Sequence, residues 1–197
     1  MPGAFAVQSS PFAVQNLEPG TVNRARTENR APWTLNCVSV SVLLDNVRSL
    51  YNVGAFFRTA DAIGITELVL AGITAAPPHP RLAKTALGAE RTVSWRHVQT
   101  AVDEATRLRE NGLQIAAVET SLQAVDLFEW RPHFPACVVF GHEVDGITPA
   151  MLEAADVHVR IPTRGSKHSL NVATAGGVVL YELLRKYQAL GGPTGRR

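Results

Sequence analysis

Cysteine is scarce in this chain, and its scarcity excludes two classes of protein. The 197 residues contain two cysteines, Cys37 and Cys137, which lie apart within apolar runs and form no CxxC pair. The six histidines show no HxxxH spacing. Two isolated cysteines are too few for a disulfide framework, and a structural metal site needs closely spaced Cys or His residues. We therefore expect buried, reduced thiols, a cytoplasmic protein and no metal.

Long apolar runs and strong charge are lacking too. No stretch approaches the roughly 18 uninterrupted apolar residues of a membrane span, and no basic segment followed by an apolar one marks a signal peptide. The net charge is only +2, so charge alone does not indicate a nucleic-acid partner. With 46% hydrophobic residues, the chain is expected to bury one substantial core.

The first 35 residues lack the periodicity of a helix or a strand. They mix Pro, Gly, Ser, Asn and Arg, so we divide the chain into an N-terminal extension, residues 1–35, and one domain, residues 36–197. Two interpretations of the extension remain open. It is either a disordered tail, or a partly ordered arm around Arg24, Arg26 and Arg30 that contacts RNA or a second subunit.

Strand and helix patterns alternate from Val38 onward. Strands are predicted at residues 37–45, 67–72, 92–98, 113–119, 136–141 and 157–162. Helices are predicted at residues 53–63, around 82–88, 99–110, 148–155 and 169–190. Successive apolar residues, as in ACVVFG from Ala136, are typical of strands buried on both faces. These patterns predict an α/β fold with a mainly parallel sheet and helices on both faces.

Ligands bind at the loops that follow the strands of such sheets, and three of these loops carry polar motifs. The first contains Asn52, Gly54 and Arg58. Because Arg58 stands among apolar residues at helical spacing, it either extends to water or holds its charge at a functional site. Asn52 and Arg58 do not share one helical face, so Asn52 is expected in the loop or at the helix cap.

The second loop, GHEVDGIT, has the glycine spacing of a phosphate-binding P-loop. However, Ile147 replaces the required Lys, and Glu143 and Asp145 would repel phosphates. Gly141 and Gly146 instead indicate a tight bend or a close approach to a ligand, with a plain surface turn as the open alternative. No strand is followed by G-x-G-x-x-G either, which disfavours a dinucleotide-dependent oxidoreductase.

The third loop, TRGSKHSLN, is basic and leads into a helix. Arg164, Lys167 and His168 precede Ser169 and Asn171, which taken singly are ordinary N-cap residues. A basic loop at the N-terminus of a helix is a natural site for an anionic backbone. We therefore expect Arg164, Lys167 and His168 to bind an anionic backbone such as that of RNA.

These three blocks together resemble the three motifs of the SpoU, or TrmH-type, branch of the SPOUT RNA methyltransferases. The blocks are N-x-G-x-x-x-R at residues 52–58, FGHEVDGI from Phe140 and IPTRGSKHSLNVATA from Ile161. The resemblance implies a deep trefoil knot in the C-terminal part, S-adenosylmethionine as cofactor and a homodimer. It also implies methyl transfer to a ribose 2′-hydroxyl of tRNA or rRNA.

The resemblance assigns residues to the cofactor. It implies that S-adenosylmethionine is held largely by the backbone at Val118, Glu119, Gly141, Ile161 and Leu170. The sequence departs from the family pattern at three positions. Leu50, Thr163 and Ala173 stand where many members have Pro, Met and Ser respectively.

Five polar residues of the motifs are the candidates for catalysis: Asn52, Arg58, Glu143, Ser169 and Asn171. Methyl transfer to an alcohol needs groups that orient the hydroxyl and accept its proton. We expect Glu143, Ser169 and Asn171 to orient the ribose and the cofactor, and Asn52 to fix Arg58 or the RNA backbone. The family resemblance makes Arg58 the general base, but a guanidinium pKa above ~12 favours a clamp on the target phosphate. The alternative function is a non-catalytic RNA-binding protein that keeps the knotted fold.

Overall fold

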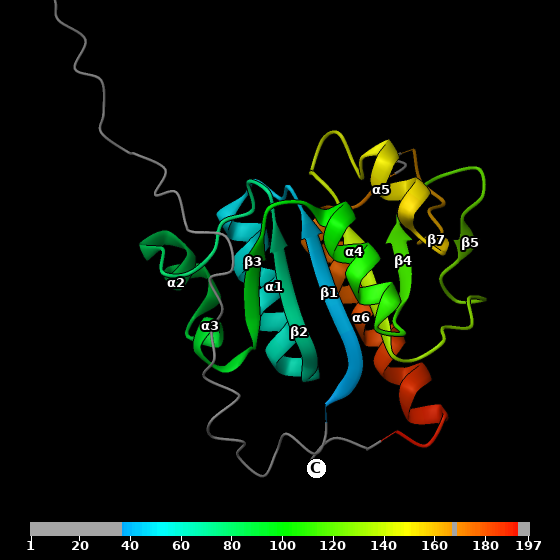
Figure 1. The fold of residues 1–197 in the computed structure, drawn as a ribbon, viewed down its shortest axis with the longest axis horizontal. Coiled ribbons are helices and arrows are strands. Elements are labelled where there is room, and N and C mark those ends of the chain that lie inside the picture. Colours follow the sequence, from blue (N-terminus) through cyan, green and yellow to red (C-terminus); the bar gives the residue numbers. More distant parts are fainter. Residues whose placement is uncertain (1–36, 167–168, 193–197) are drawn as a thin grey trace, which may run out of the picture.

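The computed structural model describes residues 37–166 and 169–192, and the N-terminal extension lies outside them. Within the described residues, one parallel sheet has the strand order β3-β2-β1-β6-β4-β7-β5 (Figure 1). Its strands are β1 (Val38–Asp45), β2 (Ile65–Ala71), β3 (Trp95–Val98), β4 (Gln114–Val118), β5 (Val125–Asp126), β6 (Ala136–Phe140) and β7 (Val157–Arg160). The helices are α1 (Leu50–Ile63), α2 (Pro80–Ala86), α3 (Ala89–Thr92), α4 (Ala101–Glu110), α5 (Pro149–Ala154) and α6 (Val172–Ala189).

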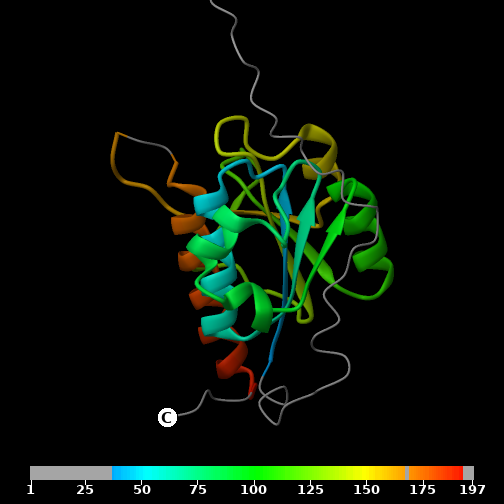
Figure 2. The same ribbon diagram turned by 90° about the vertical axis from the view of Figure 1, so that its left-hand side faces the viewer.

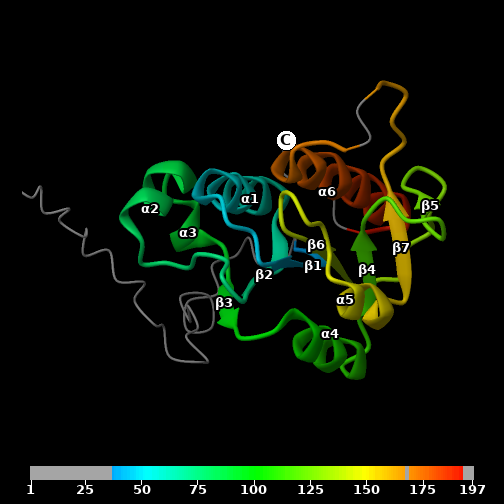
Figure 3. The ribbon, with the colours of Figure 1, turned by 90° about the horizontal axis from the view of Figure 1, so that it is seen from above.

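Helices cover both faces of this sheet. α1 and α6, with α2 and α3 beside α1, lie on one face, and α4 and α5 lie on the other (Figures 2 and 3). Successive residues of β1 point to opposite faces, so that Val42 and Leu44 join the core under α1 and α6, whereas Leu43 joins the core under α4. The predicted α/β fold with a two-sided parallel sheet is confirmed. The trefoil knot stays a prediction.

Element boundaries differ from the predicted ones where a cap or a short element intervenes. The helix predicted from residue 53 begins at Leu50, because Ser49 is its N-cap and accepts a hydrogen bond from the backbone of Asn52. Asn52 therefore lies inside α1, and its expected place in the loop or at the cap is wrong. The four-residue α3 and the two-residue β5 were not predicted, since such short elements show no periodicity.

Parallel pairing brings the carboxyl ends of the strands to one edge of the sheet. The loops that carry the three motifs follow β1, β6 and β7, so all three motifs meet at this edge. β6 lies between β1 and β4 in the sheet, although a long segment separates β1 from β6 in sequence. The strand order therefore places the first two motifs side by side.

Three expectations from composition concern residues that the structure describes. Cys137 is buried in β6, as predicted, whereas Cys37 is partly exposed; both are free thiols. None of the described helices is both long and apolar enough to cross a membrane. Within residues 37–166 and 169–192, no group of His, Cys, Asp and Glu is arranged to hold a metal ion.

Candidate functional site

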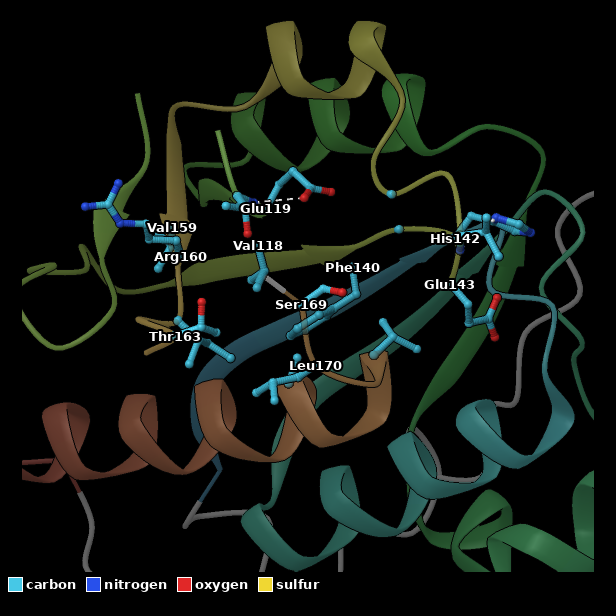
Figure 4. A pocket seen from close by; sticks show the side chains of 17 residues that line it. Val118, Glu119, Phe140, His142, Glu143, Val159, Arg160, Thr163, Ser169 and Leu170 are labelled. Atoms are coloured by element: carbon cyan, nitrogen blue, oxygen red, sulfur yellow. Dashed lines mark hydrogen bonds between the residues drawn. The ribbon is translucent and has the colours of Figure 1, made fainter. Parts of the chain in front are cut away.

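A pocket lies where the carboxyl ends of β4, β6 and β7 meet the start of α6 (Figure 4). All five residues predicted to hold a cofactor line it: Val118, Glu119, Gly141, Ile161 and Leu170. Glu143 and Ser169, predicted to act in catalysis, line it as well. The structure thus brings together residues from three distant segments of the chain, and their roles stay predictions.

The sequence reasoning missed several lining residues of this pocket. They are Thr120, Phe140, His142, Val144, Gly146, Val159, Arg160, Thr163, Val172 and Ala175. Most of them directly flank a predicted residue at a strand end or a loop, so the signal was their position after a strand rather than their chemistry. Thr163 matters most, because it is one of the three departures from the family pattern and it faces the pocket.

The glycines of the second motif make a tight bend. The backbones of His142 and Gly146 exchange two hydrogen bonds, each of 3.0 Å. A Cβ added to Gly141 would lie 2.4 Å from the carbonyl of Gly146 and 2.5 Å from the nitrogen of Ile147. Gly146 has a φ of +71°, a left-handed conformation that glycine adopts without strain. The bend predicted from these glycines is present, and it leaves no room for a side chain at Gly141.

The carboxylate of Glu119 fixes the same bend to the end of β4. Its Oε2 accepts a hydrogen bond from the backbone nitrogen of Ile147 at 3.1 Å, and its Oε1 accepts one from Thr120 at 2.8 Å. A Cβ on Gly146 would lie 2.4 Å from Oε2. The side chain of Glu119 therefore positions the second motif.

A chain of hydrogen bonds connects the three motifs through their side chains. Asn52 Nδ2 donates to Glu143 Oε1 at 2.8 Å, and Asn171 Nδ2 donates to Asn52 Oδ1 at 3.1 Å. Asn52 is only 9% exposed, so the central link is shielded from water. Asn171 also caps α6, because its Oδ1 accepts from the backbones of Ala173 and Thr174.

Glu143 is occupied by the beginning of α1. Its two oxygens accept from the backbone nitrogens of Ser49, at 2.8 Å, and Arg48, at 3.0 Å, as well as from Asn52. Burial raises the pKa of the Glu143 carboxyl, but the hydrogen bonds from Asn52, Ser49 and Arg48 outweigh it and the pKa is lowered. Glu143 is thus an ionised anchor at a helix N-terminus, where negative charge is favoured.

Among the five residues predicted for catalysis, Arg58 neither lines the pocket nor belongs to the hydrogen-bond chain of Asn52, Glu143 and Asn171. It lies exposed on α1 and is absent from the pocket lining. In the described part of the chain, its side chain makes neither a hydrogen bond nor an ion pair. Asn52, predicted to fix Arg58 or RNA, instead bonds to Glu143 and Asn171.

The residues predicted to bind RNA in the third loop are only partly described. Arg164 is exposed in the loop after β7, next to the pocket residue Thr163. Lys167 and His168 lie outside the described residues. Ser169 and Leu170 are exposed and line the pocket just before α6 begins.

Comparison with known proteins agrees with this arrangement. The sequence model of the SpoU rRNA Methylase family matches residues 39–181. The chain is 36% identical over 155 residues to the tRNA (guanosine(18)-2'-O)-methyltransferase of Escherichia coli (strain K12), covering 77% of this chain and 66% of that enzyme. The chain therefore spans slightly less than two thirds of the length of that relative.

Two solved structures share the fold. One is the TrmH/SpoU tRNA modifying enzyme of A. aeolicus, with a TM-score of 0.72, 29% identity and coverage of 80% of this chain and 81% of that one. The other is the AdoMet-bound rRNA methyltransferase of Sinorhizobium meliloti, with a TM-score of 0.70, 29% identity and coverage of 74% and 56%. With the family match over most of the described domain and the three motifs around one pocket, the chain belongs to the SpoU rRNA Methylase family.

Proposed function

We propose that this chain is a cytoplasmic, S-adenosylmethionine-dependent methyltransferase that acts on a ribose 2′-hydroxyl of tRNA or rRNA. The observation that carries the proposal is the joining of three distant motifs around one pocket by the bonds between Glu143, Asn52 and Asn171. The similarity to a tRNA 2′-O-methyltransferase and to an rRNA methyltransferase with bound AdoMet supports the reaction and the cofactor.

The pocket fits the chemistry of S-adenosylmethionine. Val118, Ile161 and Leu170 offer apolar walls for an adenine ring, and peptide groups at the ends of β4, β6 and β7 offer polar partners. Gly141 presents backbone without a side chain at this place. We propose that Val118, Glu119, Gly141, Ile161 and Leu170 hold the cofactor, which supplies an electrophilic methyl group on a sulfonium.

The variant Gly141→Ala tests this pocket. The added Cβ would collide with the backbone of Gly146 and Ile147, which has no flexible end to move away. We expect calorimetry to show at least about a 100-fold loss of affinity for S-adenosylmethionine, since roughly 2.7 kcal/mol is small for such a collision. Gly177→Ala in α6, where a Cβ meets nothing within 4 Å, is the matched control and should bind normally. Normal binding by Gly141→Ala would contradict the assignment.

We propose that the enzyme is a homodimer in which Arg58 of one subunit reaches the pocket of the other. The exposed position of Arg58, away from its own pocket, supports this arrangement. Tyr51 on α1 and Tyr181 on α6 leave 78% and 55% of their area exposed on two helices that pack together, which favours a covered surface. Light scattering should give twice the mass of one chain, and a monomer at micromolar concentration would overturn the proposal.

Arg58 and Ser169 are the groups available to act on the reacting ribose. Ser169 faces the pocket and offers a hydroxyl that orients the 2′-hydroxyl. Arg58 is a fixed cation that binds the target phosphate and stabilises the developing oxyanion, while the proton leaves through that phosphate or water. Asn52, Glu143 and Asn171 act by positioning, because their polar atoms are bonded to one another and to helix starts.

Mixed dimers test the sharing of residues between subunits. Arg58→Ala and Gly141→Ala each inactivate the site to which they belong, so either homodimer should be inactive. If Arg58 acts across the interface, a mixed dimer places both changes in one site and leaves the second site intact. After equal mixing and exchange, half of the dimers are mixed, and about a quarter of the wild-type activity should return. No recovery, with exchange verified by mass, would show that Arg58 acts within its own subunit.

The reaction itself is tested by mapping 2′-O-methyl groups in tRNA and rRNA from cells with and without the gene. At least one ribose position should lose its methyl group without the gene and regain it with the wild-type chain but not with Arg58→Ala. If no ribose position changes, the proposed reaction is wrong. The alternative of a non-catalytic RNA-binding protein predicts that outcome together with a lack of S-adenosylmethionine binding.

A further inference from the structure

The short helix α2 is fixed directly against the N-terminal half of α1. Thr85 Oγ1 donates to the carbonyl of Leu50 at 3.0 Å, and a Cβ on Gly54 would lie 2.1 Å from the same Oγ1. Along α1, Asn52 stands between Leu50 and Gly54, and Arg58 follows one helical turn after Gly54. Since Leu82 is fully buried as well, α2 has a set place beside the first motif (Figure 3).

α2 presents two cations to solvent without any acid of its own. Its sequence is PRLAKTA, and both Arg81 and Lys84 are exposed. Among the residues that the structure describes, neither side chain makes a hydrogen bond or an ion pair. They lie three positions apart, so the two charges are neighbours on the helix surface.

The cations packed around Glu104 and Asp156 on the other side of the sheet differ from those of α2. On the α4 side, Arg96 pairs with Glu67 and Glu104, and Arg107 also pairs with Glu104. The cation that ends α4, Arg109, pairs with Asp156. The arginines of this cluster are therefore paired with acids of the fold, whereas Arg81 and Lys84 have no such partner among the described residues.

The free cations of α2 fit a polyanion that passes the first motif. We propose that Arg81 and Lys84 bind phosphates of the substrate RNA on either side of the nucleotide that is methylated, so that α2 is an RNA-binding platform. This inference rests on the proposed function, because it takes the substrate to be RNA. Arg91 in α3 is not part of the platform, since it is paired with Glu90.

Charge reversal at α2 tests the platform in the full-length protein. In the double variant Arg81→Glu, Lys84→Glu, we expect the KM for RNA to rise about tenfold or more and the slope of log affinity against log salt to fall by about one to two. The affinity for S-adenosylmethionine, the kcat at saturating RNA and the Tm should remain unchanged, because both side chains are exposed and unpaired.

A matched control separates a local contact from a general loss of positive charge. Arg131 is exposed in the segment between β5 and β6, which leads to the amino end of β6, away from the motif edge. Arg131→Glu should raise the KM for RNA much less than Arg81→Glu alone. Equal effects of the two single variants would overturn the platform.

Two further outcomes contradict the inference. If the double variant keeps the wild-type KM and salt slope, RNA does not touch α2. If it instead changes the mass measured by light scattering, α2 is a subunit contact rather than an RNA contact. If the proposed function is wrong, the wild-type protein will not methylate ribose. In that case, filter binding of RNA by the wild-type protein and the double variant still tests the platform, because this assay does not depend on methyl transfer.

Discussion

Charged side chains are paired differently in the Glu104 cluster on the α4 face and around the first motif on the α1 face. On the α4 face, the nearly buried Glu104 accepts hydrogen bonds from Arg96 and Arg107, and the cations are neutralised inside the fold. Around the first motif on the α1 face, the acid Glu143 is bonded to backbone nitrogens and an amide. Within the described residues, the side chains of Arg48 and Arg58 form no ion pair. The comparison separates a cluster of paired charges inside the fold from exposed cations that are available to the anionic ligand that we propose.

The largest difference between the faces is expected for Arg58. Its replacement by Ala should lower kcat about 100- to 1,000-fold, as for other lost transition-state donors, without changing the free energy of unfolding. Arg58→Lys should retain part of the activity if the guanidinium is a clamp, and nearly none if it is the base. Methyl-transfer kinetics and urea unfolding measure the two quantities. If Arg58→Ala lowers the free energy of unfolding along with kcat, Arg58 is a structural residue.

The charge cluster on the α4 face should show the reverse behaviour. Glu104→Ala leaves the mostly buried Arg96 without its closest acid, so the free energy of unfolding should fall by about 3 kcal/mol. The kcat of the folded protein should stay normal. Urea unfolding beside the exposed control Glu153→Ala measures the loss. If both variants unfold at the same urea concentration, the cluster does not stabilise the fold.

A smaller effect, dependent on pH, is expected for Glu143. Its pKa is lowered in the folded state, so it stabilises the fold above its unfolded pKa and loses this contribution as pH falls through the folded value. Glu143→Gln should be less stable than wild type by about 1 kcal/mol at pH 7. In urea unfolding, the difference between the two proteins should shrink as the pH falls through the folded-state pKa of Glu143. A constant difference across this range would show that ionisation of Glu143 does not matter.

The smallest effect concerns the end of α2. Leu87 is 70% exposed and has a φ of +54°, which strains any residue with a Cβ. Leu87→Asn should raise the free energy of unfolding by up to about 1 kcal/mol, since Asn tolerates this conformation better. The control Leu122→Asn removes a fully exposed leucine that is not among the positive-φ residues, and it should change nothing measurable in thermal unfolding. A loss of stability in Leu87→Asn would mean that the leucine contributes to packing.

Most of the fold was predictable because its signals are local. Apolar runs marked the buried strands, and helical spacing marked α1, α4 and α6. The position of Asn52 was not predictable, since Ser49 is an equally good cap and only the structure decides between them. The elements α3 and β5 are too short to show a period.

Part of the pocket lining was predictable from the motifs, but its arrangement was not. The bonds from Asn52 to Glu143 and to Asn171 join residues 91 and 119 positions apart, and they depend on β6 lying beside β1. No local pattern contains that neighbourhood. For the same reason, the sequence indicated that Arg58 is functional but did not show that it lies outside the pocket of its own chain.

The central claim is methyl transfer from S-adenosylmethionine to a ribose 2′-hydroxyl. It is tested most directly by incubating the purified protein with RNA and cofactor labelled in the methyl group, followed by alkaline hydrolysis of the RNA. A 2′-O-methyl group blocks cleavage at its own phosphodiester. The account predicts that the label is recovered in alkali-resistant dinucleotides. Label recovered in mononucleotides, or no label in the RNA, would contradict it.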